Sequence, residues 1–183
     1  MKKRKRFDKI NSIINLFLLI VVFSVIAGFT IPKKLEKKVR KQINNTFNIT
    51  DYTLKNVIIS TKTITKVITN TNFYTINKDK LIGYAILDKA NSKITNFDYL
   101  VLLNTKLEIV NIKILIYRES HGGEISSKRW LRQFFGLGIN NHAKLQDNID
   151  GISGATISVR SMTTEIDLIL KDLKLLVKNN EIK

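Results

Sequence analysis

The chain contains no cysteine among its 183 residues, and this absence excludes several kinds of chemistry. Without a thiol there is no disulfide, no thiolate nucleophile, no cysteine-held iron–sulfur cluster, no c-type haem attachment and no lipid-modified N-terminal cysteine. Histidine is scarce too: only His121 and His142 occur, and neither has partners at the spacing of metal ligands. We therefore expect no metal site, and a redox role would need an organic cofactor.

Proline is almost absent, and the single Pro32 ends a long apolar run over residues 13–31. A helix that spans a bilayer needs about 20 mostly apolar residues, so this run is long enough. A cleaved signal peptide is the alternative, but its apolar core is usually about 7–15 residues and is followed by a small-residue cleavage site. The run is longer than that and no such site is clear. The sequence therefore favours an uncleaved transmembrane helix over residues 13–31.

The charges around this run do not by themselves fix its orientation. Six lysines and arginines precede it within residues 1–12, and six follow it within residues 33–41. The positive-inside rule therefore gives a tie. A short basic tail before an apolar core is similar to a signal anchor, which leaves residues 1–12 in the cytoplasm and exports the rest of the chain. We expect a single-pass protein of the cytoplasmic (inner) membrane, with its C-terminal domain extracytoplasmic.

The net charge of +16 raises the question of a nucleic-acid partner. Residues 1–41 carry +10 of this charge, which leaves +6 for the rest of the chain. Cations beside a membrane span are attracted to anionic lipid headgroups. No motif of a nucleic-acid-binding domain is present in the sequence. We therefore expect membrane lipid to be a partner and nucleic acid not to be.

Residues 32–71 are predicted to form a stalk or linker. A charged helix is expected over residues 33–47, where Leu35, Val39 and Ile43 are spaced by four, and its surface is interpreted as solvated. Residues 48–70 are rich in β-branched side chains, which favours a strand or an extended linker.

Residues 72–183 are predicted to form the folded domain. Short apolar runs over residues 73–76, 81–87, 99–103 and 108–117 indicate successive strands of an antiparallel sheet with one face buried. A short helix is expected from Ser126 or Ser127 to Phe135, and a long amphipathic helix from Ser158 to Lys178. Strands followed by helices indicate an α+β fold, with an antiparallel sheet packed against helices after one N-terminal transmembrane helix.

The stretch Asp150–Ser158 (DGISGATIS) concentrates small and hydroxyl-bearing residues just before the long helix. A turn followed by a helix cap is the simple interpretation, and Ser158 is expected to be a cap. A cap needs one hydroxyl, however, whereas this stretch has three, together with two glycines and an alanine. Small residues permit close approach and a helix N-terminus favours a phosphate. The pattern thus also fits a Thr156 hydroxyl held beside a phosphate-bearing group.

A second candidate, Tyr117–Glu124 (YRESHGGE), comes directly after the strongest predicted strand. Loops at strand ends are common binding sites, and paired glycines allow close backbone approach. A hairpin-like turn with surface charges is the alternative interpretation.

Together these residues resemble the FMN-binding domain family. Asp150-x-x-Ser153-Gly154-Ala155-Thr156 is similar to the family's flavin-attachment motif. Two upstream stretches, Arg118-Glu119-x-x-Gly122-Gly123-Glu124 and Trp130-Leu131-x-Gln133-Phe134-x-Gly136, resemble the family's upstream motifs in order and spacing. The resemblance covers roughly residues 72–177. The family includes the C subunit of the sodium-pumping NADH:quinone reductase, the G subunit of Rnf-type complexes and smaller membrane-anchored proteins.

The resemblance implies that FMN is joined through its phosphate to the Thr156 hydroxyl. It also implies a separate flavin transferase that installs FMN from FAD with Mg²⁺ and releases AMP. Ser153, Gly154 and Ala155 would frame the attachment point, and Asp150 would shape the turn or assist the transferase. A further group would lie against the flavin ring, namely Glu119, Gly122, Gly123 and Glu124.

One departure bears on function. The large sodium-pump and Rnf subunits usually carry a Glu-Thr-Pro-Gly-Leu-Gly type loop, whereas this chain has Glu-Ser-His-Gly-Gly-Glu, closer to the small stand-alone members. We therefore expect a membrane-anchored extracytoplasmic flavoprotein that relays electrons between partner redox proteins or a quinone. Whether it is an enzyme with its own substrate is open. The alternatives are a flavin-dependent reductase of a small extracytoplasmic acceptor and an anchored interaction module whose Thr156 is never modified.

Overall fold

A computed structural model of the protein describes residues 31–182, which lie in one compact unit. The predicted basic tail and, apart from Ile31, the predicted membrane helix over residues 13–31 lie outside the described residues. Within residues 31–182, no helix is long and apolar enough to cross a membrane.

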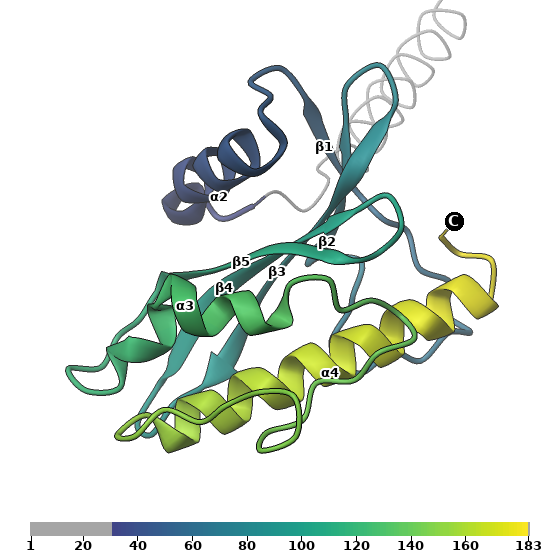
Figure 1. The fold of residues 1–183 in the computed structure, drawn as a ribbon. Helices are drawn as coiled ribbons and strands as arrows, with labels where there is room; N and C mark the ends of the chain where they lie inside the picture. Colours follow the sequence, from purple (N-terminus) through teal and green to yellow (C-terminus); the bar gives the residue numbers. More distant parts are fainter. Residues whose placement is uncertain (1–30, 183) are drawn as a thin grey trace, which may run out of the picture. The chain divides into compact units, whose positions relative to one another are not determined.

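The centre of this unit is a five-stranded antiparallel sheet in which each strand pairs with the next one along the chain. The hairpin between residues 73–76 and 81–87, the antiparallel sheet and the α+β class are confirmed (Figure 1). Strands β3 and β4 are longer than predicted, because their polar ends pair with each other. The strands are β1 (Thr53–Asn56), β2 (Phe73–Asn77), β3 (Leu81–Asn91), β4 (Asn96–Asn104) and β5 (Ile109–Ile116).

Both faces of the sheet are buried, so the prediction of a single buried face is wrong. The long helix α4 (Thr156–Lys178) covers one face, and helix α2 (Lys33–Phe47) covers the other (Figure 1). Strand β4 shows the effect most clearly, since every residue from Phe97 to Leu103 is buried. Its odd-numbered side chains join the core beneath α4, and Leu100 and Leu102 join the core beneath α2.

Helix α2 differs from the solvated helix that the sequence suggested. Leu35, Val39 and Ile43 are 6%, 0% and 0% exposed, because their spacing by four places them on one face against the sheet. The Lys38 ammonium group donates to the carbonyl of Leu115 on β5 at 2.7 Å. Helix α2 is therefore a structural layer of the folded unit.

The extended segment before β2 is held to α4 by one buried carboxylate. Asp172 is 4% exposed and accepts hydrogen bonds from the backbone amides of Lys66, Val67 and Ile68 at 2.7–3.0 Å. Three amide donors replace the water that this carboxylate loses on burial. The contact joins parts of the chain about a hundred residues apart.

The helical elements after β5 occur in the predicted order. Ser127 caps α3 (Lys128–Leu131), because its hydroxyl accepts from the Trp130 amide at 3.3 Å. The turns η1 (Gly123–Ser126) and η2 (Arg132–Phe134) flank α3. Helix α4 begins two residues before the predicted start. The apolar stripe predicted for it faces the core, with Val177 partly buried.

Candidate functional site

Thr156 is the first residue of α4, and it is exposed. Among residues 31–182 no side chain caps this end of the helix, and no acidic residue lies in its first turn. The first amides of a helix have no acceptor within the helix, and the helix dipole leaves partial positive charge there. The hydroxyl of Thr156 therefore lies where an attached anionic group would be stabilised.

Thr156 lines a small surface cavity of about 230 Å³, here called the Thr156 hollow. Three segments that are distant in the sequence build it: the β3–β4 hairpin, the loop after β5 and the start of α4. Its lining residues are Ser92, Lys93, Tyr117, Glu119, His121, Gly122, Gly154, Ala155, Thr156, Ile157 and Ser158.

A cluster of three hydroxyl groups joins these segments. The Ser158 hydroxyl lies 2.6 Å from that of Ser92 and 3.1 Å from that of Tyr117. The Tyr117 hydroxyl also lies 3.1 Å from that of Ser92, and it donates to the carbonyl of His121 at 2.9 Å. Ser158 is 2% exposed and lies inside α4, so the prediction that it caps the helix is wrong. It fastens α4 to both loops instead.

Glu119 supports the hairpin that borders the hollow. Its carboxylate accepts from the backbone amides of Ile94 at 2.8 Å and Thr95 at 3.1 Å. These two amide donors lower the pKa of Glu119, since they stabilise its charged form. The neighbouring Arg118 forms an ion pair with buried Asp98, and it also donates to the backbone carbonyl of Asn96. These two contacts of Arg118 fix the base of the same hairpin.

Gly122 has a backbone that only glycine adopts easily. Its φ is +81°, and a Cβ at this position would lie 2.6 Å from the Tyr117 hydroxyl and 3.7 Å from Ala155. Gly123 and Glu124 lie in η1, are exposed and do not line the hollow. The structure thus brings Glu119 and Gly122 to Thr156, but not the next two residues of the predicted loop.

Asp150 and Ser153 are exposed and also lie outside the lining of the hollow. The backbone of Asp150 is held on both sides: its carbonyl accepts from the Trp130 indole at 2.8 Å, and its amide donates to the Gln133 side chain at 2.8 Å. The Trp130–Gln133 stretch therefore positions the entrance to the Thr156 segment. Gly154, with φ of +81°, forms the turn directly before α4.

Sequence reasoning did not identify Ser92 and Lys93 as part of this site. They lie in the β3–β4 hairpin, far from Thr156 in the sequence, and their Ser-Lys sequence carries no signal of its own. Only the sheet pairing of β3 with β4 brings them to α4. Lys93 matters chemically, because it places an exposed cation in the same hollow as the Thr156 hydroxyl.

The described residues do not gather metal ligands. Within residues 31–182, no group of three or more His, Asp or Glu side chains is placed to hold a metal ion. His121 lines the hollow, while His142 pairs with Asp147 at 3.2 Å in an exposed turn.

Comparisons with known proteins find a similar fold and a matching domain. The crystal structure of Shewanella oneidensis NqrC is similar with a TM-score of 0.57 and 11% sequence identity, over 81% of this chain and 99% of that chain. At this identity the likeness concerns the fold. No curated protein matches the chain. Residues 95–171, which include Thr156, match the FMN-binding domain. This part of the chain is therefore similar to the FMN-binding domain family.

Proposed function

We propose that the protein carries FMN covalently on Thr156 through a phosphodiester and relays electrons between redox partners. The observation that carries this proposal is the position of Thr156. Thr156 is exposed at the uncapped N-terminus of α4, and it lines the Thr156 hollow together with Lys93 and His121. Helix amides and a nearby cation supply favourable interactions for a phosphate in this position.

The residues present fit the cofactor. The phosphate would lie at the first amides of α4, and Lys93 would offset its charge. Ile157, which is 50% exposed, supplies apolar surface next to the attachment point. The hollow of about 230 Å³ is smaller than the 300–1,000 Å³ typical of pockets that bury a ligand. A covalent bond suits such a site, because it retains the cofactor without enclosing it.

Attachment requires access and a leaving group. In the reaction we propose, a flavin transferase joins the Thr156 hydroxyl oxygen to the FMN phosphorus of FAD, with Mg²⁺. The bond between the two phosphates of FAD breaks, AMP leaves, and the hydroxyl proton passes to a base of the transferase or to water. A Cβ atom added at Gly154 would have no described atom within 4 Å other than those of its chain neighbours. The space beside this residue is therefore open, which leaves an approach to Thr156.

We further propose that residues 13–31 anchor the protein in the cytoplasmic membrane and that the flavin domain is extracytoplasmic. A covalent bond prevents loss of the cofactor there. FMN supplies the redox chemistry when bound, and the protein supplies position and electrostatics. Because the chain has no cysteine, no thiol of this protein can carry out redox chemistry in place of the flavin. A quinone or a partner redox protein would exchange electrons with it.

Intact-mass measurement tests the attachment. Co-expression with a flavin transferase should add the mass of one FMN minus water, and Thr156→Ala should abolish the addition. Thr164→Ala is the matched control, because Thr164 is an exposed threonine of the same helix, and it should be modified normally. A flavin still covalently bound to the Thr156→Ala protein would contradict the site.

The relay role has a separate test. The flavin-loaded protein should be reduced and reoxidised by membranes that contain its partners. It should not turn over rapidly with a small-molecule donor and acceptor alone. Rapid turnover without a partner would instead support a reductase of a small acceptor.

A further inference from the structure

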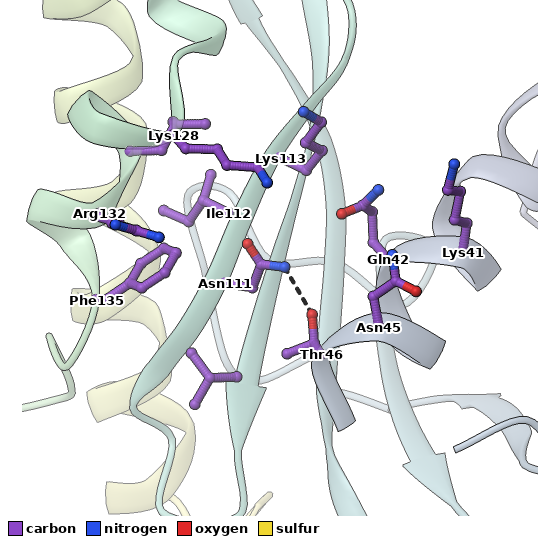
Figure 2. A pocket seen from close by; sticks show the side chains of 12 residues that line it. Lys41, Gln42, Asn45, Thr46, Asn111, Ile112, Lys113, Lys128, Arg132 and Phe135 are labelled. Carbon is purple, nitrogen blue, oxygen red and sulfur yellow. Dashed lines mark hydrogen bonds between the residues drawn. The ribbon is translucent and has the colours of Figure 1, made fainter. Parts of the chain in front are cut away.

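A second cavity, here called the β5 groove, lies between α2 and α3 beside strand β5. Its volume is about 500 Å³. Figure 2 shows side chains of α2 on one side, those of α3 and η2 on the other, and β5 between them. It shares no lining residue with the Thr156 hollow. Its lining is Lys41, Gln42, Asn45, Thr46, Val110, Asn111, Ile112, Lys113, Lys128, Leu131, Arg132 and Phe135.

Strand β5 is the last strand of the sheet, and its outer edge is closed only near its two ends. At one end, Ile109 exchanges two backbone hydrogen bonds of 2.8 Å with Gly136 and Leu137. At the other end, Lys38 donates to the carbonyl of Leu115. Between these points, no backbone hydrogen bond joins residues 110–113 to any described segment other than β4. A short stretch of open strand edge therefore faces the groove.

All the charged side chains that line the β5 groove are positively charged. Lys41, Lys113, Lys128 and Arg132 line it, whereas no aspartate or glutamate does. None of the four cations has a salt bridge or a hydrogen bond from its side chain within residues 31–182. They come from α2, β5, α3 and η2 around one cavity, and their potentials add there. The groove is thus electrostatically complementary to an acidic occupant.

The remaining lining suits a polypeptide. Asn111 donates to the Thr46 hydroxyl at 2.7 Å, which fixes its amide at the strand (Figure 2). Ile112 is buried in the core behind β5, and Phe135 is 39% exposed at the rim. An added strand places successive side chains on opposite faces, so polar and apolar side chains can both be accommodated.

We propose that the β5 groove binds a short, acidic, extended segment of a partner protein, which adds to the edge of β5 as a further strand. The open stretch over residues 110–113 corresponds to about 13 Å of strand at roughly 3.3 Å per residue. Backbone hydrogen bonds to β5 would hold the segment, and the four cations would select acidic side chains. The site does not depend on the flavin, so it remains testable if Thr156 is never modified.

Fluorescence anisotropy with the full chain tests this proposal. The probe is a fluorescein-labelled peptide of sequence Glu-Val-Glu-Thr-Glu. The triple variant Lys113→Gln, Lys128→Gln, Arg132→Gln should weaken its binding about tenfold, since exposed ion pairs each contribute about a factor of two to three. Peptide binding should also slow hydrogen exchange of the β5 amides in residues 110–113.

Two controls separate a strand site from general attraction to a basic protein. The triple variant Lys62→Gln, Lys80→Gln, Lys106→Gln removes the same charge from exposed positions outside the groove and should change affinity less than about twofold. A peptide with N-methylated alternate amides keeps its charge but cannot pair with β5, and it should bind much more weakly. Equal loss in both triple variants, equal binding of the methylated peptide, or no binding at low salt would each overturn the proposal.

Discussion

Replacing Gly122 by alanine should disturb the Thr156 hollow through a single added methyl group. The backbone of Gly122 has φ of +81°, and the new Cβ would lie 2.6 Å from the Tyr117 hydroxyl. That distance is below van der Waals contact, so the tyrosine or the loop must move. Tyr117 cannot move freely, because its hydroxyl is hydrogen-bonded and its ring packs against Phe97 at 5.9 Å between centroids.

Two contributions set the size of the effect. A non-glycine residue in the left-handed region costs about 1–2 kcal/mol. Displacing the Tyr117 hydroxyl puts its three hydrogen bonds at risk, and losing two of them costs about 1–3 kcal/mol. We therefore expect Gly122→Ala to lower the free energy of unfolding by about 2–5 kcal/mol.

Urea denaturation monitored by circular dichroism measures this loss, with Gly123→Ala as the matched control. The φ of Gly123 is not positive, and a Cβ atom added there would have no described atom within 4 Å beyond its chain neighbours. Gly123→Ala should therefore lower the free energy of unfolding by less than about 1 kcal/mol. In a Tyr117→Phe background the clashing oxygen is absent, and Gly122→Ala should then cost only about 1–2 kcal/mol. The reasoning is refuted if Gly122→Ala costs the same in both backgrounds, or no more than Gly123→Ala.

Three further predictions concern buried or paired polar groups. Asp172→Asn should lower the free energy of unfolding by about 3 kcal/mol, because the amide loses the negative charge that three backbone donors stabilise and turns an NH2 group toward the Lys66 amide, which donates to the other carboxylate oxygen; a loss below about 1 kcal/mol in urea denaturation would contradict this. Glu119 has a lowered pKa in the folded state, so its contribution to stability is present above about pH 4.5 and is lost as the pH falls through the folded-state value. The stability difference between wild type and Glu119→Gln should therefore shrink on acidification, and a difference that is constant from pH 7 to pH 3 would refute this. Tyr99→Phe should leave stability unchanged or raise it by about 1 kcal/mol, since the Tyr99 hydroxyl is buried without a hydrogen-bond partner among the described residues; thermal unfolding more than a few degrees below wild type would contradict it.

The secondary structure was largely readable from local patterns. Alternation of isoleucines in β5 and the apolar stripe of α4 predicted the correct elements, because both signals depend only on side-chain spacing along the chain. The second buried face of the sheet was missed. Its signal was present in the unbroken apolar run of β4, Tyr99–Leu103, since a strand with one solvated face would alternate.

The resemblance to the family pointed to Glu119 and Gly122, which line the hollow with Thr156, whereas Ser92 and Lys93 of the β3–β4 hairpin carried no signal in the sequence. Asp150 and Ser153 belong to the motif but lie outside the hollow, and the Trp130–Gln133 stretch that holds Asp150 in place acts through backbone contacts. Ser158 was assigned to capping on its position before a predicted helix, although α4 begins earlier and buries it. An error of two residues in the predicted start of α4 was enough to change the role expected of Ser158.

The sequence by itself determined most of the elements and the absence of thiol chemistry, because both depend on local residue types and spacing. The hydroxyl proposed to carry FMN followed from the resemblance of Asp150–Thr156 to a family motif. Only the tertiary structure decided what surrounds that hydroxyl. The pairing of β3 with β4 brings Ser92 and Lys93 to the start of α4, and α2 and α3 flank the open edge of β5. Contacts between distant segments arise from packing two layers of helices on one sheet, which no short window of sequence contains.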